Sequence, residues 1–171
     1  MPLNLKTTDF RIILIFGNAT SVHRKTNTGN LLNGLANKYK IFASTLDLQD
    51  VDVMKDRIQN GANLLESHVF QFDFLNDEFL PKSNGGKLPD DLYKIITNKE
   101  ERKKLVIYIN PPYAEATTAS TVAGTGANKS GVATTNRTYE KYKNIIGKIS
   151  NEIYAQFLIR IYLEIQFCRF P

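Results

Sequence analysis

Four short apolar runs along the chain are bounded by polar or turn residues, a pattern typical of β-strands. They cover residues 11–16, 40–45, 68–72 and 104–109. The last run is continuous and rich in β-branched residues, as expected of a strand that is covered on both faces. The pattern therefore predicts four strands, of which at least the last is buried within a sheet.

Helical patterns lie between and after these runs. Residues 29–38 carry three leucines at helical spacing, and residues 50–60 place Val51, Met54 and Ile58 on one face. One long helix is predicted over residues 139–165, and its second half, residues 153–165, carries a strong apolar stripe at helical spacing, for which core packing is the simplest explanation. Strands that alternate with helices predict an α/β fold, with a parallel sheet of about four strands and flanking helices.

Residues 114–138 do not continue the alternation of strands and helices, because they are dense in Thr, Ala, Ser and Gly and have no apolar periodicity. A segment of ~25 residues is longer than a passive connector needs, so we expect a mobile functional loop. Within it, residues 124–130 look like a phosphate-binding loop. Asn128 occupies the position where that motif needs glycine, and no strand precedes it, so we discount a nucleotide site.

Length, charge and cysteine content narrow the class of protein. The 171 residues fit one domain or part of a larger one, and a net charge of +5 fits attraction to phosphate without being specific for it. The single cysteine, Cys168, excludes a disulfide within the chain and a cysteine-rich zinc site, and no metal site is indicated. No export or membrane segment is visible, which predicts a cytoplasmic protein without membrane association.

The sequence Asn110-Pro111-Pro112-Tyr113 directly follows the fourth predicted strand, at the edge where open α/β sheets bind ligands. The carbonyls of the Asn110 side chain and the Pro111 main chain can accept both N–H groups of a planar amine and localise its lone pair. The prolines fix the backbone and offer no competing N–H. Tyr113 can stack on a base that has been taken out of a duplex. A proline-rich turn with ordinary tyrosine packing is the structural alternative.

Residues 105–113 resemble the catalytic motif of the amino-methyltransferases that act on adenine in DNA. The resemblance implies a Rossmann-like fold of methyltransferase type and S-adenosylmethionine as cofactor. It also implies methyl transfer to the 6-amino group of adenine, in a restriction-modification setting. The catalytic residues would be Asn110, Pro111, Pro112 and Tyr113.

The same resemblance assigns cofactor-binding residues upstream of the catalytic motif. Asp47 matches the acid after the second strand that binds the ribose hydroxyls. Asp73 and Phe74 resemble the pair after the third strand that contacts the cofactor's adenine. Taken singly, each acid is also what a turn or a helix cap carries.

A third cofactor segment would be the glycine-rich loop after the first strand, where Thr28, Gly29 and Asn30 are the matching residues. The chain departs from the family pattern here. Asn27 replaces the first glycine of the loop, and His23 stands where the family has an acid.

The resemblance covers residues 22–165 and lacks the later strands and the target-recognition domain of the family. Residues 1–171 are therefore expected to form a single, partial catalytic domain. The expected partners are double-stranded DNA with a flipped adenine, and a second polypeptide that supplies the missing strands. The cations of the loop and the last helix would contact phosphates or form a solvated basic face: Lys129, Arg137, Lys141 and Lys143.

Three functional alternatives stay open. Enzymes that methylate RNA bases or protein glutamine use the same tetrapeptide, because their substrates present the same planar nitrogen. A catalytically inactive fragment that retains only a binding or structural role fits the sequence as well. Binding of S-adenosylmethionine and transfer of a labelled methyl group distinguish these alternatives.

Overall fold

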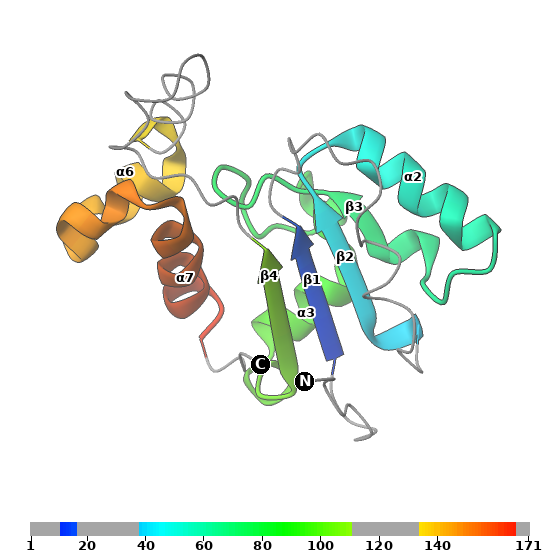
Figure 1. Cartoon of the computed structure of the whole chain (residues 1–171). Coiled ribbons are helices and arrows are strands. Elements are labelled where there is room, and N and C mark those ends of the chain that lie inside the picture. The colour runs from blue at the N-terminus through cyan, green and yellow to red at the C-terminus, as the bar shows by residue number, and fades with distance from the viewer. Residues whose placement is uncertain (1–10, 17–37, 111–133, 167–171) are drawn as a thin grey trace, which may run out of the picture.

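The computed structural model describes residues 11–16, 38–110 and 134–166, which form a four-stranded parallel sheet with flanking helices (Figure 1). The strands lie in the order β3-β2-β1-β4. Their bounds are β1 (Arg11–Phe16), β2 (Ile41–Thr45), β3 (Val69–Gln71) and β4 (Leu105–Asn110). All three pairings are parallel, so the four carboxyl ends lie at one edge of the sheet. The predicted strands and the predicted parallel α/β class are confirmed.

Helix α2 (Leu48–Gln59) covers one face of this sheet. Its buried residues Val51 and Met54 pack against Ile41, Ala43 and Val69 of the strands. Ile58 is partly buried against the same cluster. The helix predicted over residues 50–60, with its apolar face, is therefore confirmed, and it begins two residues earlier than expected.

Helices α3 (Asp90–Thr97) and α7 (Ile153–Glu164) supply the core on the other face of the sheet. Successive side chains of a strand face opposite sides of the sheet, so the strand residues next to those that contact α2 point toward α3 and α7. The aromatic and aliphatic core on this side includes Phe42, Phe70, Leu105, Ile107, Leu92, Ile95, Phe157 and Ile161. α3 was not predicted, since two helical turns carry too little periodicity to stand out.

The prediction of one helix over residues 139–165 is wrong. The segment forms α6 (Arg137–Ile146), the 3-10 helix η4 (Gly147–Asn151) and α7. Gly147 has φ 58° and ψ −137°, a backbone conformation that glycine adopts without a steric penalty, and it ends α6. The apolar stripe of residues 153–165 thus lies in α7 and its C-cap, and α6 is a separate helix that packs on α7.

The remaining elements are short: η1 (Lys38–Lys40), η2 (Glu66–His68), η3 (Lys82–Asn84) and α4 (Lys99–Arg102). Of the helix predicted over residues 29–38, only residue 38 is described, in η1. The loop predicted over residues 114–138 lies outside the described residues up to 133, and Arg137 and Thr138 belong to α6. Across the described ranges, no helix combines the length and apolarity needed to cross a bilayer.

Candidate functional site

The carboxyl edge of the sheet brings together the ends of strands that carry predicted site residues. The main-chain N–H of Phe72 donates to the carbonyl of Thr45 at 2.8 Å, and the Gln71 side chain donates to the carbonyl of Leu46 at 3.0 Å. These bonds fasten the segments that lead into Asp47 and Asp73. At the same edge, β1 and β4 are neighbours, and Phe16 at the end of β1 is paired in register with Asn110 at the end of β4. The chain therefore leaves β1 and β4 from neighbouring positions.

Asp47 is exposed and caps the N-terminus of α2. Its Oδ1 accepts a hydrogen bond from the main-chain N–H of Gln49 at 2.9 Å, which satisfies one of the free donors of the first helical turn. Within the described part of the chain, its other carboxylate oxygen has no hydrogen-bond partner. Asp47 is thus a helix cap that retains one open acceptor at the edge of the sheet.

Asp73 organises the turn that follows β3. Its carboxylate accepts from the main-chain N–H groups of Leu75 (3.0 Å) and Asn76 (3.2 Å), and from the Asn76 side chain (2.8 Å). A carboxylate has about four lone-pair sites, so these bonds leave room for about one more donor. The cap role of Asp47 and the turn role of Asp73 are the structural roles that each acid suggests when taken singly.

Phe74 faces the protein core and is only 4% exposed. Its ring stacks on Phe157 of α7, with 4.7 Å between centroids, and meets Phe79 edge-on at 5.6 Å. An aromatic ring needs an accessible face to pack on a cofactor's adenine. In this structure Phe74 packs on protein instead, so its role in cofactor binding stays a prediction.

The structure describes only some of the other predicted site residues. Asn110 is the last residue of β4, at the carboxyl edge. Pro111, Pro112 and Tyr113 lie outside the described residues, as do Thr28, Gly29 and Asn30 of the predicted glycine-rich loop. The structure therefore brings Asp47, Asp73 and Asn110 to one edge and leaves the remaining assignments as predictions.

A second polar cluster, formed around Arg160 of α7, was not predicted. Arg160 is 4% exposed, and its guanidinium donates to the main-chain carbonyls of Phe74 and Asp77. Its Nε donates to Glu164 Oε2 at 3.3 Å, and its charged end lies 4.4 Å from the centre of the Phe79 ring. Arg160 thus fastens α7 to the segment that follows β3 and contains Asp73.

Glu164 collects the hydrogen bonds of this cluster. Its Oε1 accepts from Lys141 Nζ at 3.0 Å and from the Tyr142 hydroxyl at 2.5 Å. Burial by itself raises the pKa of Glu164, but the Tyr142 hydrogen bond and the charges of Arg160 and Lys141 outweigh it, so the pKa is below its ordinary value. Burial and then the contact with Glu164 raise the pKa of Tyr142. Burial lowers the pKa of Arg160, and the Glu164 charge opposes this shift.

The N-terminus of α6 reaches the same segment after β3. The hydroxyl of Thr138 and its main-chain N–H both donate to the carbonyl of Leu75, at 2.7 and 3.1 Å. The main-chain N–H of Arg137 donates to the Asn76 side chain at 2.9 Å, and Asn76 in turn donates to Asp73. Hydrogen bonds therefore run from α6 through Asn76 to the Asp73 carboxylate.

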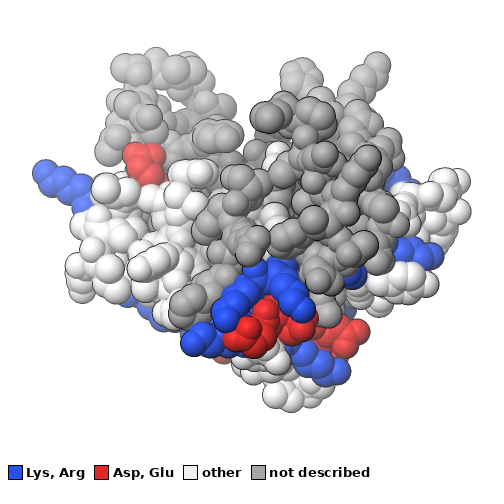
Figure 2. All heavy atoms as spheres, turned by 90° about the horizontal axis from the view of Figure 1, so that it is seen from below, with Lys and Arg blue, Asp and Glu red and all other residues white. Residues whose placement is uncertain are grey.

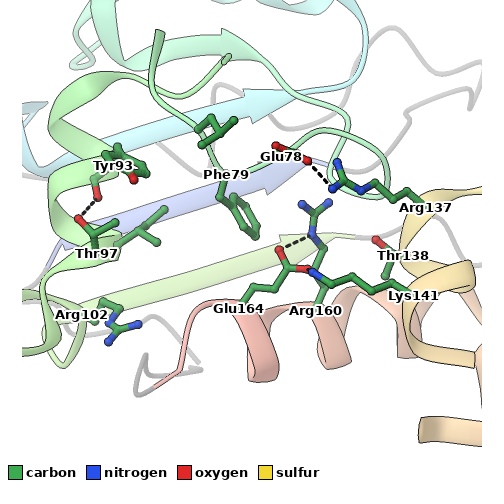
Figure 3. Close-up of a pocket in the computed structure, with 12 residues that line it drawn as sticks. Glu78, Phe79, Tyr93, Thr97, Arg102, Arg137, Thr138, Lys141, Arg160 and Glu164 are labelled. Carbon is green, nitrogen blue, oxygen red and sulfur yellow. Dashed lines mark hydrogen bonds and ion pairs between the residues drawn. The ribbon is translucent and has the colours of Figure 1, made fainter. Parts of the chain in front are cut away.

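A cavity of about 520 Å3 lies beside Arg160, between α3, α4, α6 and α7. Figure 3 shows Phe79, Arg160 and Glu164 facing this space, with Arg102 at the far end. The lining also includes Tyr93, Ile96 and Thr97 of α3 and Arg137, Thr138 and Lys141 of α6. Asp47 and Asp73 are not among the described residues that line the cavity.

The basic residues of α6 each have an acidic partner. Arg137 pairs with Glu78, Lys141 with Glu164 at 3.0 Å, and Lys143 with Glu140 at 2.6 Å. Lys129 lies outside the described residues. These ion pairs account for the cations structurally, and contact with phosphates stays a prediction.

Cations and acids are also mixed on the face seen from below (Figure 2). In and beside α4, Lys103 pairs with Glu100 at 2.8 Å and Lys104 with Glu101 at 3.8 Å. Neighbouring charges of opposite sign cancel much of each other's field. The described part of α4 therefore does not concentrate positive charge.

Sequence reasoning missed Arg160 and Glu164, although a signal was present. Both lie in the predicted apolar stripe, at helical spacing from Phe157 and Ile161, and a charged residue on a buried helix face requires a partner. That partner could not be named from the sequence, because the carbonyls that Arg160 binds are more than eighty positions away.

Comparison with known proteins adds no assignment to this geometry. Neither family models, nor curated proteins, nor solved structures give a match to the chain. Among the described residues, no three metal-ligating side chains of the His, Cys, Asp or Glu type cluster together.

Proposed function

We propose that the chain is the catalytic part of an S-adenosylmethionine-dependent methyltransferase that modifies the 6-amino group of adenine in DNA. One observation carries the proposal: Asn110 is the last residue of β4, and Asp47 and Asp73 follow β2 and β3 at the same edge of the sheet. In open α/β sheets, ligands bind outside the carboxyl ends of the strands. The residues that the family resemblance assigns to cofactor and substrate thus share the edge where such a site belongs.

The strand order supports a Rossmann-like fold for this proposal. The order β3-β2-β1-β4 corresponds to the 3-2-1-4 part of the doubly wound arrangement. The direction of winding changes between β1 and β4, and ligands bind at that switch point. Phe16 and Asn110 are paired there. The chain continues from these two strands into the segments that contain the predicted glycine-rich loop and the two prolines of the catalytic motif.

Asp47 fits the proposed cofactor better than Asp73 does. Its open carboxylate oxygen is exposed and can accept from a ribose hydroxyl, whereas Asp73 already accepts three hydrogen bonds. S-adenosylmethionine would supply an electrophilic methyl group on a sulfonium. Asn110 would accept an N–H of the adenine amine through its side-chain carbonyl, which localises the nitrogen lone pair for attack. Of the two contacts, the hydrogen bond from a ribose hydroxyl to the Asp47 carboxylate would be charge-assisted and therefore the stronger one.

Calorimetry of the full chain with S-adenosylmethionine tests the proposal first, and transfer of a labelled methyl group to DNA, RNA and protein tests the substrate. We expect binding and transfer to adenine in DNA. We expect Asn110→Ala to lower transfer by about 10²–10³-fold, the range seen when one positioned polar group is removed from a transition state. Cofactor affinity should stay unchanged, and Asn144→Ala on the exposed side of α6 is the matched control.

Each other result assigns the chain differently. Transfer to RNA or to protein glutamine would overturn the substrate and keep the chemistry. If calorimetry detects no heat of binding at millimolar S-adenosylmethionine, the chain is an inactive fragment with a binding or structural role. Equal loss of affinity and transfer in Asn110→Ala would show that Asn110 is structural. The predicted DNA duplex and second polypeptide are partners under this proposal alone.

A further inference from the structure

We propose that the cavity between α3, α4, α6 and α7 binds a small organic anion, namely a carboxylate on an aromatic or aliphatic body. Its volume of about 520 Å3 falls in the range of small-molecule sites, roughly 300–1,000 Å3. Neither Asp47 nor Asp73 is among its described lining residues, so the proposed anion site does not use these two acids of the proposed methyltransferase site.

The charge of the lining favours an anion. Arg137 pairs with Glu78, while Lys141 and Arg160 share the single acid Glu164, which leaves a surplus of one positive charge among these five lining side chains. Charges that line a cavity act through less water than charges on an open surface, so the surplus attracts an anion more strongly there.

Arg160 offers hydrogen-bond donors for that anion. A guanidinium has five N–H groups, and three of those of Arg160 are used, toward Glu164 and the carbonyls of Phe74 and Asp77. Within the described part of the chain, the other two have no acceptor. A buried donor without an acceptor costs free energy, and a guanidinium fork matches the two oxygens of a carboxylate. A carboxylate in the cavity would satisfy these donors.

Part of the cavity lining, here called the apolar wall, consists of apolar side chains, which favours an organic body over a bare ion. Phe79, Leu80 and Ile96 line it, together with the ring of Tyr93. Figure 3 shows the Phe79 ring beside the Arg160 guanidinium. The distance from Arg160 Cζ to the centre of the Phe79 ring is 4.4 Å. A flat aromatic carboxylate can therefore place its acid group toward Arg160 and its ring against this wall. Benzoate is the simplest probe with that shape.

Calorimetric titration of the full chain with benzoate tests the proposal. The neutral benzyl alcohol and inorganic phosphate serve as comparison probes at constant ionic strength. We expect saturable 1:1 binding of benzoate with a dissociation constant in the roughly millimolar range, as befits a small probe. Benzyl alcohol should bind at least about tenfold more weakly, because a hydrogen bond to a charged group is lost. Phosphate should also bind more weakly, because it leaves the apolar wall uncovered.

Two variants locate the binding. Arg137→Gln lowers the positive surplus and should weaken benzoate severalfold, whereas Arg57→Gln on α2 is the matched control and should leave it unchanged. Thr97→Trp should abolish binding by filling the cavity from an exposed position of α3. The proposal is overturned by no saturable binding of benzoate up to about 10 mM. It is also overturned by equal affinity for either comparison probe, or by full binding in Thr97→Trp.

Discussion

The carboxyl edge of the sheet and the Arg160 cluster are both built from polar side chains, but their contacts differ in range. At the edge, Asp47 binds Gln49 two positions away, and Asp73 binds Leu75 and Asn76 two and three positions away. In the cluster, Arg160 binds carbonyls 86 and 83 positions away, and Tyr142 binds Glu164 across 22 positions. The two acids at the edge are thus held by local hydrogen bonds, whereas the cluster joins distant segments.

This difference separates the expected roles of the two regions. A local cap or turn leaves its carboxylate near solvent, where an open oxygen of Asp47 can serve a ligand. A buried cluster that joins α6, α7 and the segment after β3 instead stabilises their packing. Substitutions at the edge should therefore change ligand binding, and substitutions in the cluster should change stability.

The largest effect is expected from Arg160→Met. Methionine fills part of the volume but leaves the carbonyls of Phe74 and Asp77 without their donor and Glu164 without one of its partners. Breaking a buried ionic contact on one side costs about 3–5 kcal/mol, so the urea unfolding midpoint should fall sharply. Arg57→Met on an exposed part of α2 is the matched control and should change stability by no more than about 0.5 kcal/mol. Equal stability losses in the two variants would show that the cluster does not stabilise the fold.

The difference in contact range also explains how far sequence reasoning reached. Strands β1 to β4 were predicted because each is a compact apolar run, and α2 because Val51 and Met54 repeat at helical spacing. The positions of Asp47, Asp73 and Asn110 followed, since residues after parallel strands must share an edge.

What failed depended on packing between distant segments. Gly147 divides the predicted long helix, and a single glycine inside a helical pattern is compatible with a helix that continues and with one that ends. The burial of Phe74 depends on Phe157 of α7, and the cavity on four helices that have no common sequence pattern. These features are properties of the assembled fold.

An intermediate effect is expected from Asp47→Asn, measured as affinity for S-adenosylmethionine. Asparagine caps helices about as well as aspartate, so the bond to Gln49 and the stability should persist. The negative charge that would face the ribose hydroxyls is lost, and affinity should fall by about tenfold, the value of one charge-assisted hydrogen bond. Asp52→Asn, an exposed change on the same helix, is the control. A stability loss without an affinity loss would make Asp47 a helix cap and nothing more.

The smallest effect, and the sharpest test of the Arg160 cluster, is the pH dependence of Glu164→Gln. The pKa of Glu164 is lowered in the folded chain, because the Tyr142 hydrogen bond and the charges of Arg160 and Lys141 outweigh the effect of burial. A carboxylate with a lowered pKa stabilises the fold above its unfolded pKa of about 4.3, and this contribution disappears as the pH falls through the folded value. The stability advantage of the native chain over Glu164→Gln, from urea unfolding, should therefore be constant near neutral pH and shrink below about pH 5. An advantage that grows on acidification would mean that burial dominates at Glu164 and that its partners do not hold the carboxylate in its charged form.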